Sequence, residues 1–148
     1  MESRTVDVAV VGVANAINLL MAGLFLARAA GHARLETVLG AAVIAMAVPA
    51  LGALYLNVSH AREWWTVALL VPVVAFCVIE LVLDFMLQLP FRTTWMLWPY
   101  LALYYLAVLA LIGYGFGVGR IFGFVTLGTY LLALGATWYA HTGARTAV

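Results

Sequence analysis

Two acidic residues, Glu80 and Asp84, lie inside a long apolar run at residues 66–89. Their spacing of four residues puts both carboxyl groups on one face of a helix, and Gln88 continues that stripe. An ionisable residue inside a bilayer costs about 2.5–3.5 kcal/mol, so we expect it to have a function. Two ionised carboxylates this close repel each other, and apolar surroundings disfavour the charged form. The pair therefore needs a shared proton, a bound cation or an arginine partner.

Further polar residues are predicted at a similar depth. With a rise of 1.5 Å per residue and each span centred on the bilayer, Glu80 lies about 4 Å from the midplane. Asp84 lies about 10 Å from it, level with Tyr100. Two asparagines and two tyrosines fall within about 5 Å of the midplane. The candidate ligand- or ion-binding residues are therefore Glu80, Asp84, Asn15, Asn18, Tyr104 and Tyr130.

Two interpretations of these residues follow. In one, four of the spans enclose a polar cavity around Glu80 and Asp84, and the segment 38–56, whose interior is almost wholly apolar, faces lipid or is purely structural. In the other, the polar groups form hydrogen bonds between helices, worth about 0.6–2 kcal/mol each. Arg28 or Arg92 then pairs with Asp84.

Several chemistries lack the residues that they need. All seven basic residues are arginines, which excludes a Schiff-base lysine and a P-loop. The single cysteine, Cys77, cannot form a redox pair. Histidines are predicted at opposite membrane interfaces, so we expect no metal site and no cofactor. A net charge of +1 gives no footprint for nucleic acid.

The composition identifies the elements that position these residues. Apolar residues make up 67% of the 148-residue chain and charged residues 9%, whereas soluble domains average about 45–50% and 25%. A soluble domain of this size cannot bury so much apolar surface. We therefore predict an all-α, polytopic integral membrane protein: a single domain, 1–148, with short loops in a compact bundle. Its five transmembrane helices are predicted at 8–27, 38–56, 66–89, 96–118 and 121–140.

The boundary between the last two spans follows from length. One helix over 96–140 would be about 67 Å long, roughly twice the thickness of the hydrocarbon core. The chain must therefore break, and a run of alternate glycines ending at Gly119 and followed by Arg120 marks the place.

Aromatic residues are expected at both interfaces. Side A, which holds the N-terminus, receives Tyr55, Trp64 and Trp65, and we expect Trp64 and Trp65 to anchor the protein in the membrane. Side B, at the opposite interface, receives Trp95, Trp98, Trp138 and Tyr139. Arginines are nearly balanced between the sides, with a slight excess in short loops that favours side B as cytoplasmic.

Three functions are compatible with the sequence. The first is a transporter, channel or ligand-binding bundle for a proton, cation or small amphiphile, using the carboxylate pair. The second is a non-catalytic accessory or assembly subunit of a membrane complex. The third, a lipid-modifying enzyme, lacks a ligand or catalytic set around the carboxylates, so we favour a non-enzyme. We expect a multi-pass protein of the cell membrane that contacts lipid and forms a homo-oligomer or joins a partner membrane subunit.

Overall fold

The structure is a computed structural model that describes residues 2–87, 89 and 94–143. The side chains of Glu2, Asp84 and Phe85 lie outside this description. The elements are α1 (Glu2–Ala29), α2 (Ala33–Ala45), α3 (Ala47–Ser59), α4 (Trp64–Ala68), α5 (Val71–Glu80), the π-helix η1 (Leu81–Met86), α6 (Leu97–Val118) and α7 (Arg120–Gly143).

Five stretches of helix are long and apolar enough to cross a membrane, and they pack together. The predicted all-α class is therefore confirmed. The candidate spans are Ser3–Ala29, Ala33–Ser59, Trp64–Leu83, Leu97–Val118 and Arg120–Thr142.

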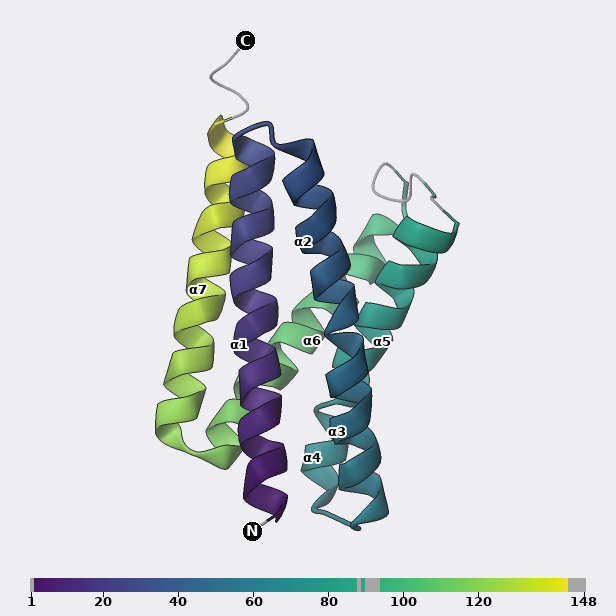
Figure 1. The fold of residues 1–148 in the computed structure, drawn as a ribbon, viewed down its shortest axis with the longest axis vertical. Coiled ribbons are helices and arrows are strands. Elements are labelled where there is room, and N and C mark those ends of the chain that lie inside the picture. Colours follow the sequence, from purple (N-terminus) through teal and green to yellow (C-terminus); the bar gives the residue numbers. More distant parts are fainter. Residues whose placement is uncertain (1, 88, 90–93, 144–148) are drawn as a thin grey trace.

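The bundle is built around α1. Helix α7 lies along α1 over most of its length, and α2 and α3 follow each other along its other flank (Figure 1). Helix α6 crosses behind α1 at an angle, from the start of α7 to α5 (Figure 1). The start of α1 lies at one end of the molecule and the end of α7 at the other. We keep the names side A for the end with the start of α1 and side B for the opposite end.

Proline interrupts the second span. Helix α2 ends at Ala45 and α3 begins at Ala47, with Met46 as a turn between them. Pro49 has no N–H to donate to the carbonyl of Ala45, so the chain of helical hydrogen bonds is broken there. The two helices still continue in nearly the same direction, as one span (Figure 1).

The third span is less regular than the single helix predicted over 66–89. Helix α4 ends at Ala68, the residue whose carbonyl Pro72 cannot bond, and α5 begins at Val71. After Glu80 the α-helix changes into η1. π-Helical turns are rare and occur frequently at functional sites.

The predicted break before Arg120 is found at Gly119, whose backbone is extended. Helices α6 and α7 then approach closely. A Cβ atom on Gly115 would lie 3.2 Å from the Cα of Gly123 and 3.2 Å from the carbonyl oxygen of Phe122. These glycines therefore allow a tight hairpin of two helices.

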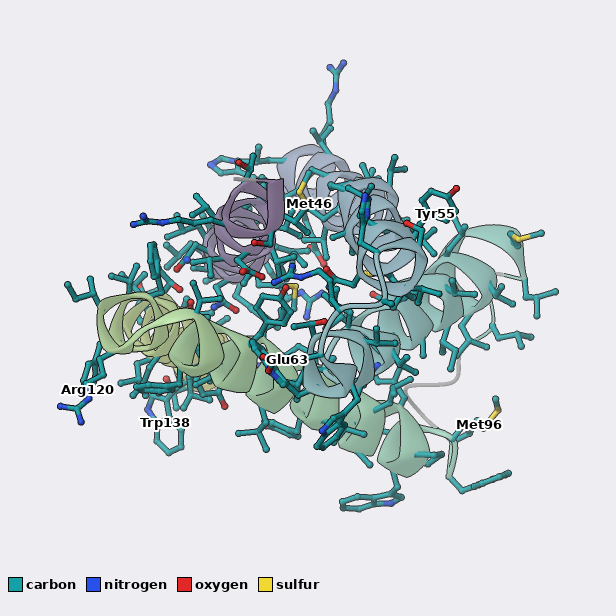
Figure 2. The ribbon with its side chains drawn as sticks, turned by 90° about the horizontal axis from the view of Figure 1, so that it is seen from below. Met46, Tyr55, Glu63, Met96, Arg120 and Trp138 are labelled. Carbon is teal, nitrogen blue, oxygen red and sulfur yellow. The ribbon has the colours of Figure 1, made fainter. Side chains whose placement is uncertain are left out.

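The aromatic residues mostly lie where the sequence places them. Tyr55 and Trp64 are exposed near side A, and Trp138 near side B. Figure 2 shows Tyr55 and Trp138 pointing away from the bundle, from α3 and α7. Trp65 is an exception to the anchor that we predicted. It turns inward, and its ring lies 5.3 Å from that of the buried Tyr114.

Candidate functional site

A cavity of about 740 Å³ lies in the side-B half of the bundle. This volume is within the range of pockets that hold small molecules, about 300–1,000 Å³. It reaches exposed residues at the end of the bundle, among them Thr37 and His141. Its described wall residues come from five helices: Met21, Leu24, Phe25, Arg28, Glu36, Thr37, Gly40, Glu80, Leu97, Tyr100, Leu101, Tyr104, Tyr105, Tyr130, Leu134, Thr137 and His141.

One helix on this wall was not expected there. We predicted that the second span faces lipid or is purely structural, yet Glu36, Thr37 and Gly40 of α2 line the cavity. The reason is that these residues precede or begin the apolar part of the span. The polar surface of α2 therefore lies in its first two turns, at the mouth of the cavity.

Glu80 is the carboxylate on the inner part of this wall. It is partly buried, at the end of α5, and accepts a hydrogen bond from the hydroxyl of Tyr100 on α6. The sequence analysis expected Tyr100 about one helical turn nearer side B than Glu80.

Aromatic rings form much of the remaining wall. Tyr104 and Tyr105 contact each other edge to face, with ring centroids 5.2 Å apart. Phe76, a core residue of α5, packs against Tyr100 at 5.7 Å and against Tyr104 at 5.4 Å. Tyr130 joins them from α7. Since α5 holds Phe76 and Glu80 one turn apart, the same helix orients the rings and the carboxylate.

The mouth of the cavity holds an ion pair. The guanidinium of Arg28, at the end of α1, lies 2.6 Å from a carboxylate oxygen of Glu36 on α2. It also lies over the ring of Phe25, 5.3 Å from the centroid. Arg28 therefore pairs with Glu36, and its suggested pairing with Asp84 stays a prediction. The Asp84 side chain and the whole of Arg92 lie outside the described residues.

The two candidate asparagines lie elsewhere, between α1 and α7. The Asn18 amide donates to the carbonyl of Thr126 at 3.3 Å and to the hydroxyl of Thr129 at 3.0 Å. Asn15 accepts from the same hydroxyl at 2.8 Å. Neither asparagine is among the described wall residues, so the structure brings together Glu80, Tyr104 and Tyr130 but not these two.

A second polar cluster, which the sequence analysis did not assemble, closes side A. Asp7 on α1 lies 2.8 Å from the guanidinium of Arg62 and accepts a hydrogen bond from Tyr114 at 2.8 Å. Arg62 also donates to Asn57 at 2.9 Å. Asn57 and Tyr114 are fully buried, and Thr66 lies beside them, where its backbone carbonyl accepts from Asn57. The cluster joins α1, α3, α4 and α6.

The depth of these residues in the membrane could have predicted this cluster. Asp7, Arg62 and Tyr114 all fall near side A when the spans are aligned, as Glu80 and Tyr100 fall near side B. The hydrogen bond to Asp7 raises the pKa of Arg62 above its already high ordinary value. Arg62 therefore stays charged at any physiological pH.

The chemistry of the cavity is that of a binding site. Among the described residues there is no group of three histidine, cysteine, aspartate or glutamate side chains that could hold a metal ion. A carboxylate, several phenols and aliphatic side chains can hold a small molecule with one cationic or polar group. Comparison with known proteins adds no assignment: no family model, no curated protein and no solved structure matches the chain.

Proposed function

We propose that the protein is a multi-pass protein of the cell membrane that binds a cation or small amphiphile in the side-B cavity. The observation that carries this proposal is the position of Glu80 on the wall of a cavity of about 740 Å³. A carboxylate used only to join helices would not need an empty volume beside it. Binding is also the step that a carrier, a channel and a membrane receptor share.

Asp84 belongs to the proposed site as a second acidic group. It follows Glu80 by four residues, within η1. Asn15 and Asn18 are left out of the proposed site. Their amides bond α1 to α7 at a place outside the cavity.

Protection of a cysteine on the wall tests the proposal. Thr137 lines the cavity and its hydroxyl bonds only its own helix, at Ala133, so Thr137→Cys should fold normally. Dodecyltrimethylammonium and dodecyldimethylamine oxide, one cationic and one net-neutral amphiphile, serve as probes below their micellar concentrations. We expect at least one of them to slow labelling by N-ethylmaleimide in nanodiscs about fivefold or more, by occupying the cavity.

Thr142→Cys is the matched control. Thr142 also bonds a carbonyl of its own helix, at Trp138, but it is not among the described wall residues. Its labelling should be unchanged by either probe, and the unsubstituted chain reports the background from the buried Cys77. If neither probe protects Thr137→Cys, the proposal is wrong. If Glu80→Gln instead detaches a partner subunit, the protein is an assembly subunit.

A further inference from the structure

The side-B cavity extends through one half of the membrane. On α7 its wall runs from Tyr130, near the middle of the span Arg120–Thr142, to His141 close to the side-B end. At a rise of 1.5 Å per residue this length is about 16 Å, or about half of a hydrocarbon core of about 30 Å. The cavity therefore lies at the depth of the side-B leaflet.

Helices α6 and α7 form two edges of this cavity and separate towards side B. They meet at Gly119 and diverge from there (Figure 1). The described buried residues of α6 begin at Ala107, so its side-B half is less covered by other helices than its side-A half. Helix α7 packs instead on α1, where Ala133 and Ala136 contact Ala22. Helix α1 therefore forms the floor between the two edges.

The gap between these edges is open to the side. Tyr105 on α6 and Leu134 on α7 line the cavity, yet they are 45% and 42% exposed. Both lie within about 5 Å of the middle of their spans, so their exposure does not come from the end of the bundle. Figure 2 shows α6 and α7 at the edge of the molecule away from α2. The cavity therefore has a lateral opening beside Tyr105 and Leu134, which faces the hydrocarbon layer.

The polarity of the wall changes along its length as it does along a lipid. The charged side chains among the described wall residues lie towards side B: Arg28 and Glu36 at the mouth, and Glu80 beside Tyr100 in the first turn of α6. Towards the middle of the membrane the described wall consists of aromatic rings and aliphatic side chains: Met21, Tyr104, Tyr105, Tyr130 and Leu134. Lipids of the side-B leaflet have their headgroups at the level of the first end and their chains at the level of the second.

Resting on the ligand-binding function proposed above, we infer that the ligand is a lipid of the side-B leaflet that enters laterally between α6 and α7. Its headgroup takes the polar part of the cavity near the mouth, and one alkyl chain lies on α1 between the two edges. A lipid with two chains is larger than a cavity of about 740 Å³, and the lateral opening lets the second chain remain in the bilayer. A water-soluble compound that enters through the mouth is the alternative ligand.

Photolabelling from the bilayer tests this inference. The protein is held in nanodiscs that contain a small fraction of phosphatidylcholine with a diazirine midway along one acyl chain, and fragment mass spectra locate the adducts. Leu24 lines the cavity beside α2, 3.6 Å from the place of a Cβ atom on Gly40, so a lipid chain reaches it through the cavity. Leu19, on the same helix, is 52% exposed and outside the described wall, so the surrounding bilayer labels it directly. We expect adducts on both leucines.

Substitutions at the edge test the route of entry. Leu134→Trp places a large ring in the lateral opening and should lower the ratio of Leu24 to Leu19 adducts about fivefold or more. Leu132→Trp is the matched control. It makes the same change on an exposed residue of α7 outside the described wall and should leave the ratio unchanged. Leu134→Ala removes bulk from the edge, so the ratio should not fall.

The outcomes separate this inference from the proposed function. An unchanged ratio in Leu134→Trp would overturn lateral entry, and so would an equal fall in Leu134→Ala, which cannot block the opening. If Leu24 carries no adducts in the unsubstituted chain while Thr137→Cys is still protected by the probes described above, the lipid ligand is wrong and the binding cavity stands. Loss of that protection would overturn the proposed function itself.

Discussion

The two described ion pairs differ in how much solvent reaches them. The side chains of Asp7 and Arg62 are 16% and 15% exposed, whereas those of Glu36 and Arg28 are 31% and 41% exposed. An exposed pair contributes little to stability because water screens it. Removing one partner of a buried pair is much more costly, because the other charge is left without compensation.

We therefore predict that Arg62→Ala lowers the free energy of unfolding by about 3 kcal/mol. Arg28→Ala, the matched change in the exposed pair, should cost about 1 kcal/mol or less. Unfolding in mixed micelles of increasing denaturing-detergent fraction measures both. Equal losses in the two variants would show that the side-A cluster is no more buried in solution than the mouth of the cavity.

The raised pKa of Arg62 also predicts how its contribution to stability depends on pH. Its pKa is raised in the folded protein, so its stabilising contribution is complete below its ordinary pKa and is lost only as the pH rises beyond the raised value. The difference in stability between Arg62→Ala and the unsubstituted chain should therefore be the same at pH 7 and pH 10. Unfolding at both values measures it, and a loss of the difference by pH 10 would contradict this assignment.

For single residues, the sequence indicated which polar side chains matter better than it indicated which of them contact each other. Glu80 stood out because a carboxylate in an apolar run is costly, and it does lie on the wall of a cavity. Its partner Tyr100 was expected at the level of Asp84, because depth alone does not show which side chains of two spans meet. Asp7 and Tyr114 lie 107 residues apart in sequence, and no local pattern connects them.

At the scale of helices, some boundaries could be predicted from the local sequence. Helix α6 ends at Val118, Gly119 breaks the chain of helices, and α7 begins at Arg120, as length and glycine content predicted. The change from α5 to η1 was not predictable from hydrophobic periodicity, because the six residues of η1 are too few to show a period of their own. Pro49 and Pro72 lie inside the predicted spans 38–56 and 66–89, and both spans do continue beyond the breaks in their helices.

The α6–α7 hairpin gives a test at the scale of elements. Gly115→Ala should lower the melting temperature, because the added methyl group would press on the backbone of Gly123 and Phe122 at 3.2 Å. We expect a loss of about 1–3 kcal/mol from this overpacking. In Gly128→Ala the methyl group meets nothing within 4 Å, so this control should gain up to about 1 kcal/mol from helix propensity. A gain in both variants would mean that the hairpin can open without cost.

At the scale of the whole molecule, an odd number of spans puts the two ends of the chain at opposite ends of the bundle. Helix α1 begins at one end of the bundle and α7 finishes at the other (Figure 1). The cavity therefore opens at the end where α7 finishes, while the Asp7–Arg62 cluster closes the other. In the proposed function, a ligand would therefore reach Glu80 from side B.

This arrangement predicts opposite labelling of the two ends. Ser3→Cys and Thr142→Cys, both at exposed positions, should react with a membrane-impermeant maleimide from opposite faces of the membrane. Intact cells and inside-out vesicles should therefore label complementary variants, and the unsubstituted chain gives the background from Cys77. Labelling of both variants in intact cells would require an even number of spans.

The hydrogen bonds of Asn18 have a consequence for biosynthesis. Both of its bonding partners, Thr126 and Thr129, belong to the last helix, 108 and 111 residues later in the chain. At about 5–20 residues per second, a ribosome needs roughly ten seconds to reach them. During that interval the first helix carries a membrane-buried amide whose final partners do not yet exist. The bundle therefore completes its assembly only with the arrival of α7.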